Sequence, residues 1–110
     1  AIYATYESRW NEIGHAPEHS LGFVNIPWPV TKLIDNVGAL ADEALMSFLI
    51  NELRTGLEGK SLKARAKAEI MRWHPDKFAQ FFGSKIHESE IYAVSEGVDT
   101  VARFLTAIIS

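Results

Sequence analysis

The feature that most constrains the fold is a proline at position 75, directly after a segment with strong helical character. Residues 62–73 are rich in Ala, Lys, Arg and Glu, which favour helix, and Ser61 is a typical N-cap residue. The helix must end before Pro75, because proline lacks a backbone N–H and clashes with the preceding turn. The sequence therefore predicts a helix over 62–73 that is followed by a connection containing His74, Pro75 and Asp76.

Apolar residues recur at helical spacing along much of the chain, and strict alternation is nearly absent, so we expect an all-α fold. A first helix is predicted over residues 2–13 and a last helix over about 88–109. Thr31 is expected to cap a helix that pauses near Gly38. The core stripe of the last helix is predicted at Ile91, Val94, Val98, Val101, Leu105 and Ile108.

Asp42 is expected to cap a further helical segment that continues to Leu53, unless this segment and the preceding one form a single bent helix. Residues 54–59 contain two glycines and predict a connector. Residues 77–82 predict a short turn after the tripeptide, before the break at Gly83.

Residues 15–29 predict an ordered loop, within which residues 21–26 can be extended. Trp28 stands between two prolines, so the backbone around it is stiff. We expect Trp28 to pin this loop onto the core.

Length and composition limit the classes of protein to which the chain can belong. Its 110 residues predict one domain, with an N-terminal helical layer and loop over 1–59 and a helical hairpin over 60–110. The absence of cysteine excludes disulfides and thiolate zinc sites, and we expect no metal and no cofactor. No apolar run is long enough for a membrane span, and no signal peptide is evident, which predicts an intracellular protein, cytoplasmic or nuclear.

The tripeptide at 74–76 has two interpretations. In the first, its role is only structural, since Pro75 ends one helix and the Asp76 carboxylate caps the next. In the second, the His74 imidazole and the Asp76 carboxylate bind a partner by hydrogen bonds and an ion pair. The cluster of basic residues around it would then supply a cationic docking face through Lys63, Lys67, Arg72 and Lys77.

A basic helix, an aromatic residue and His-Pro-Asp-Lys before a long apolar-striped helix resemble a divergent J-domain, the co-chaperone module that acts on Hsp70. The resemblance covers Leu62, Lys63, Lys67, Arg72 and Trp73. It implies an antiparallel helical hairpin with a His-Pro-Asp loop that stimulates the ATPase of an Hsp70-type chaperone. The chain departs from the J-domain pattern at Ala66 and Glu69, and it lacks the usual Tyr-Tyr and Leu-Gly motif of the first helix.

A second resemblance covers more of the chain. Residues 71–82, Lys85-Ile86 and 94–105 resemble the C-terminal region of the NF-kappa-B inhibitor-like protein 1 family, which has an Arg-Trp-His-Pro-Asp-Arg-Phe core. Residues 6–10 and 26–30 resemble blocks in compact fungal proteins of the same kind, most of them uncharacterised. The resemblance implies a J-like fold and a non-catalytic scaffold linked to signalling or RNA processing, in which the tripeptide is structural.

Other functions find less support in the residues. The basic residues can hold RNA phosphates, but no aromatic platform for stacking bases stands beside them. His15 and His19 would share a metal only in a helix, which Gly14 and Pro17 disfavour. No phosphate loop, serine elbow or cysteine nucleophile is present, so we do not expect an enzyme. Large aromatics, including Phe81 and Phe82, predict core positions, although an exposed Phe81-Phe82 pair would be a protein-binding patch.

Overall fold

The computed structural model describes residues 2–51 and 59–110, with side chains from Thr5 onward. Its α-helices are α1 (Ile2–Gly14), α2 (Asp42–Leu49), α3 (Leu62–Trp73), α4 (Pro75–Phe82) and α5 (Ile91–Ile109). Four short 3-10 turns are η1 (Phe23–Asn25), η2 (Val37–Ala39), η3 (Gly83–Lys85) and η4 (Glu88–Glu90). In this part of the chain no strand is present beyond an isolated bridge between Leu21 and Ile86. The prediction of an all-α fold is confirmed.

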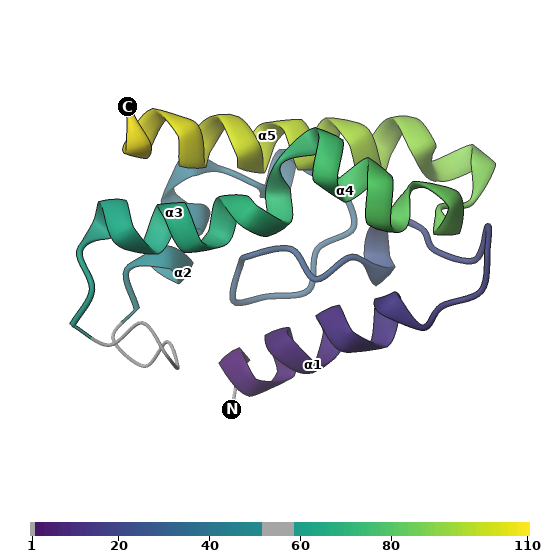
Figure 1. Cartoon of the computed structure of the whole chain (residues 1–110), viewed down its shortest axis with the longest axis horizontal. Helices are drawn as coiled ribbons and strands as arrows, with labels where there is room; N and C mark the ends of the chain where they lie inside the picture. Colours follow the sequence, from purple (N-terminus) through teal and green to yellow (C-terminus); the bar gives the residue numbers. More distant parts are fainter. Residues whose placement is uncertain (1, 52–58) are drawn as a thin grey trace.

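The helices lie in layers around one core (Figure 1). α3 and α4 follow one another along one side of α5, and α5 runs back past both of them in the opposite direction (Figure 1). α1 lies on the side of α4 away from α5 (Figure 1). The corner between α3 and α4 therefore lies beside the middle of α5 and not at its end.

Aromatic rings from three other segments contact Trp73, the last residue of α3, whose side chain is 0% exposed. Trp10 of α1 makes an edge contact with it at 4.9 Å between ring centroids. Trp28 and Phe78 stack on it at 5.3 and 6.1 Å. Such pairs contribute about 0.5–1.5 kcal/mol each beyond the area that they bury. The position next to His74 is thus the centre of the core.

Trp28 holds the long loop against α5, as the sequence predicts. Its indole N–H donates a 2.8 Å hydrogen bond to the carbonyl of Phe23, and its ring lies against Gly97 of α5. A Cβ atom at position 97 would lie 2.4 Å from Cη2 of Trp28. Glycine at this position allows the close approach of ring and helix.

The predicted helix after Thr31 is wrong, because the first helical turn after it is the 3-10 turn η2. Residues 31–38 include several with low helix propensity, and Leu33 is 85% exposed. The partly buried Ile34 and Val37 pack on the core without forming the helix. α2 is consequently a separate helix and not part of a bent one. Asp42 lies in its first turn, while Ala41 is the N-cap residue. The predicted continuation of this helix to Leu53 is wrong, because α2 ends at Leu49 and neither Ile50 nor Asn51 is helical. Leu53 itself and residues 54–58 of the predicted connector lie outside the described residues.

The boundaries of α1, α3 and α5 agree with the sequence predictions to within three residues. Two further predictions are wrong. Residues 77–82 belong to helix α4 instead of a turn, and part of the segment 21–26 forms the 3-10 turn η1 instead of an extended strand. Helix α4 forms because Phe78 and Phe82, four residues apart, pack together on the Trp10 ring. Within the described residues, no helix has the length and hydropathy that crossing a bilayer requires.

Candidate functional site

The tripeptide forms a corner between two helices. α3 ends at Trp73 and α4 begins at Pro75, so His74 alone lies between them. The expected His-Pro-Asp loop is therefore replaced by a one-residue junction. Proline is well suited to the first position of a helix, because its fixed φ is helical and its missing N–H would have no helical partner.

His74 itself caps α4. Its Nδ1 accepts a hydrogen bond of 3.2 Å from the backbone N–H of Asp76. The sequence assigned this capping role to the Asp76 carboxylate, and that assignment is wrong. Asp76 instead lies in the first turn of α4, where a negative charge is favoured by the helix dipole. All three residues of the tripeptide are exposed, although the neighbouring Trp73 is buried.

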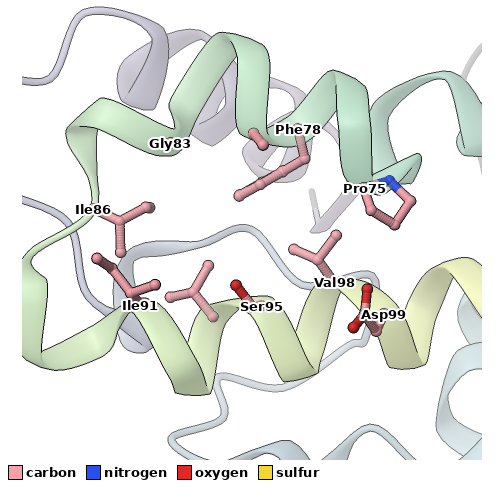
Figure 2. Close-up of a pocket in the computed structure, with 10 residues that line it drawn as sticks. Pro75, Phe78, Gly83, Ile86, Ile91, Ser95, Val98 and Asp99 are labelled. Carbon is pink, nitrogen blue, oxygen red and sulfur yellow. The ribbon is translucent and has the colours of Figure 1, made fainter.

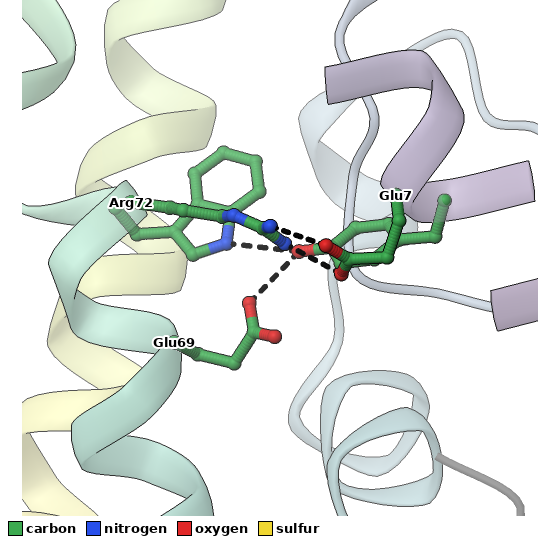
Figure 3. Close-up of polar contacts among 5 residues, drawn as sticks. Glu7, Glu69 and Arg72 are labelled. Atoms are coloured by element: carbon green, nitrogen blue, oxygen red, sulfur yellow. Dashed lines mark hydrogen bonds and ion pairs between the residues drawn. The ribbon is translucent and has the colours of Figure 1, made fainter. Parts of the chain in front are cut away.

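The guanidinium of Arg72, a residue expected in the cationic docking face, is bound by α1. Glu7 of α1 accepts two hydrogen bonds from it, one of them 2.8 Å long (Figure 3). The guanidinium also lies over the rings of Tyr6 and Trp10, at 5.5 and 5.2 Å from their centroids. The hydrogen bond to Glu7 raises the pKa of Arg72 above its usual value, while partial burial opposes the rise.

The remaining basic residues divide between the core and the surface. Arg65, which lies between Lys63 and Lys67 in the sequence, is buried and donates hydrogen bonds to the carbonyls of Leu49, Asn51 and Lys60. Lys63 and Lys67 are exposed and one turn apart, so they share the outer face of α3.

Lys77 connects this outer face to the corner. Its Nζ lies 3.8 Å from Sδ of the exposed Met71, which is one turn beyond Lys67 on α3. The structure thus brings Lys63, Lys67 and Lys77 to one side of the corner and directs Arg72 to another side.

On the other side of the corner a groove runs between α4 and α5 (Figure 2). Its volume is about 200 Å³, and most of its lining is apolar. Pro75 and Asp99 lie at one end, and Gly83 and Ile91 at the other (Figure 2). The rest of the lining consists of Phe78, Ala79, Ile86, Val94, Ser95 and Val98. The groove therefore begins at the tripeptide.

The groove residues were missed from sequence as a site. Ile91 was assigned to the core stripe of the last helix, yet it is 49% exposed and lies at the open end of the groove. The available signal was Ser95 and Asp99, two polar residues placed one turn apart beside an otherwise apolar stripe. Val94, Val98, Val101 and Leu105 are buried as predicted, and Ile108 is half-buried.

Two other candidates from the sequence are outside this region. His15 bonds to the carbonyl of Asn11, and His19 follows the end of α1 with a φ of 58°, so the two do not share a helix. Among the described residues no group of His, Cys, Asp or Glu is arranged to hold a metal ion. The Phe81-Phe82 pair is divided, since Phe81 is 63% exposed and Phe82 packs on the core.

Comparison with protein families gives a match over residues 43–108 to the model of the NF-kappa-B inhibitor-like protein 1 C-terminal domain. The chain belongs to this family. The part that matches this NF-kappa-B inhibitor-like domain runs from the first turn of α2 into the end of α5 and includes the tripeptide and the groove. Comparisons with curated proteins and with solved structures give no significant match.

Proposed function

We propose that the chain is a non-catalytic protein-interaction module, a scaffold of the NF-kappa-B inhibitor-like type, whose contact surface is centred on the corner at 74–76. One observation carries this proposal. The tripeptide is exposed, yet it is attached to the most buried ring of the core, Trp73. A corner held in this way loses little conformational entropy when a partner binds it.

Family membership supports a scaffold more directly than it supports any named partner. The resemblance links such scaffolds to signalling or RNA processing, and either role would be exercised in the cytoplasm or nucleus. Direct RNA binding is the weaker version, because Arg65 is buried and Arg72 is paired with Glu7. If only Lys63, Lys67 and Lys77 contacted phosphates, the affinity for RNA would depend only weakly on salt concentration.

The proposal is tested by differential capture of partners on the immobilised chain. Wild type is compared with the double variant His74→Asn, Asp76→Asn, in which Asn at position 74 retains a side-chain acceptor for the cap. The matched control, Glu12→Gln with Asp35→Asn, removes charges elsewhere on the surface. We expect a defined protein to be lost from the first variant and retained by the control. Identical captured sets on all three would contradict the proposal.

Hsp70 co-chaperone activity is the second candidate function, and the exposure of His74 and Asp76 favours it. α3 and α5 run antiparallel, and Lys63 and Lys67 lie on the outer face of α3, where a J-domain would dock its partner (Figure 1). The chain would then raise the ATP turnover of an Hsp70, and His74→Gln would abolish the rise. Unchanged turnover with cognate Hsp70 proteins would remove this candidate and leave the scaffold intact.

A further inference from the structure

The groove between α4 and α5 has the shape of a docking site for a helix. The eight residues of α4 extend over about 12 Å, which corresponds to roughly two turns of a partner helix. Both walls are helices, whose backbone groups are hydrogen-bonded within each helix. An extended peptide would find no backbone partners there, whereas a helix satisfies its own backbone and inserts only side chains.

The acidic charge at one end of the groove has no partner among the residues that the structure describes. Asp99 lies at the end formed by Pro75, and Asp76 is the next residue after Pro75. Both carboxylates are exposed, and neither makes a hydrogen bond or ion pair among the described residues. Arg103 lies one turn beyond Asp99 on α5 but is not paired with it.

The cations closest in sequence to the groove are engaged elsewhere. The Lys85 amine donates hydrogen bonds to the carbonyls of Gly14 and Ala16, at 3.1 and 2.9 Å. Lys77 is directed toward Met71, on the other side of the corner. The end of the groove at Asp99 is therefore acidic as well as open.

We propose that this groove binds an amphipathic helix of a partner protein, which inserts apolar side chains between α4 and α5 and places a Lys or Arg against Asp99. The inference rests on the proposed interaction function and specifies the chemistry of the partner. A second copy of the chain fits less well, because a symmetric contact centred on this groove would place Asp99 against the opposite end of the other copy's groove, whose lining contains no Lys or Arg.

The probe is a displayed library of helical peptides with random residues along one face and at both ends of that face. We expect selection on wild type to enrich apolar residues at spacings of three and four, together with Lys or Arg at one end. An enriched peptide is then synthesised and its affinity measured by fluorescence anisotropy. Asp99→Lys should weaken it about tenfold or more, because it places like charges together. Ala79→Glu, in the groove wall, should abolish binding.

Glu96→Lys is the matched control, because it makes the same change of charge on α5 at an exposed residue outside the groove lining. Its affinity should stay within about twofold of wild type, as expected for a charge outside the contact. Since Ala79 and Asp99 are also exposed, all three variants should keep the helical circular dichroism of wild type. Peptides without a cation, no enrichment at all, or equal losses in Asp99→Lys and Glu96→Lys would overturn the proposal. If wild type formed concentration-dependent dimers and Ala79→Glu were monomeric, self-association through the groove would replace the proposed partner helix.

Failure of the groove is distinguishable from failure of the interaction function. If partners are lost from the His74→Asn, Asp76→Asn variant but retained by Ala79→Glu and Asp99→Lys, the groove assignment fails and the interaction function stands. If none of these variants loses a captured protein, both proposals fail.

Discussion

Tyr6 of α1 donates a 2.8 Å hydrogen bond to the carboxylate of Glu69 on α3, and both side chains are 4% exposed (Figure 3). The indole N–H of Trp73 lies 3.4 Å from the same tyrosine oxygen. A buried carboxylate is costly unless hydrogen bonds compensate for its lost hydration. This network therefore allows an acid to occupy the core side of α3.

Tyr6→Phe should lower the free energy of unfolding by about 2–3 kcal/mol, because it removes a hydrogen bond to a buried charged group. Urea denaturation measures the loss. The control is Tyr92→Phe, which makes the same change at a side chain that is 80% exposed, and it should leave the midpoint unchanged. Equal midpoints for wild type and Tyr6→Phe would show that the hydroxyl contributes nothing.

Gly97→Ala should destabilise the fold by about 1–3 kcal/mol, because the added methyl group meets the ring of Trp28. Gly83→Ala is the matched control, since a Cβ at that position would meet only the Cβ of Ala79 at an ordinary 3.9 Å. Thermal denaturation of the two variants compares them directly. A Gly97→Ala protein as stable as Gly83→Ala would contradict the close contact between loop and helix.

Replacing His74 by Ala should cost about 1 kcal/mol, because α4 loses its side-chain cap. His74→Asn should recover most of that loss through its own side-chain oxygen. Asp76→Ala should cost less, about 0.3–1 kcal/mol, since only its interaction with the helix dipole is removed. A lower denaturation midpoint for Asp76→Ala than for His74→Ala would indicate that Asp76, and not His74, caps α4.

The Arg72–Glu7 ion pair should contribute about 0.2–1 kcal/mol, because both side chains are partly exposed, at 32% and 46%. A double-mutant cycle with Arg72→Ala and Glu7→Ala measures this coupling, with Lys67→Ala as a control for an exposed cation on the same helix. The pKa of Arg72 is raised above its already high usual value, so the coupling should persist from neutral to mildly alkaline pH and disappear only at strongly alkaline pH, where the guanidinium loses its proton. A coupling of zero at neutral pH would make the contact incidental.

The sequence predicted α3 well because its limits are local, with Ser61 accepting a hydrogen bond from the N–H of Ala64 at one end and Pro75 at the other. Helix α4 was missed because its stability depends on distant rings. In the sequence, Phe78 and Phe82 belong to a short aromatic segment without a clear helical signal. In the structure, Trp10 of α1 packs against both rings.

The candidate site shows the same division between local and distant determinants. The tripeptide could be identified from its residue types alone. The ion pair of Arg72 with Glu7, 65 positions away, could not be predicted from the sequence. Helical spacing identifies the apolar face of α5, yet it does not reveal where α4 leaves part of that face open. Arg65 is a further example. An arginine is expected at the surface, but in this structure its side chain is buried.

Arg65 joins the end of the α2 region to the start of α3, because one guanidinium group holds the carbonyls of Asn51 and Lys60. The separation of these two points is therefore constrained by a buried side chain of α3. A substitution at position 65 would consequently alter the end of the α2 region as well as the helix in which it is made.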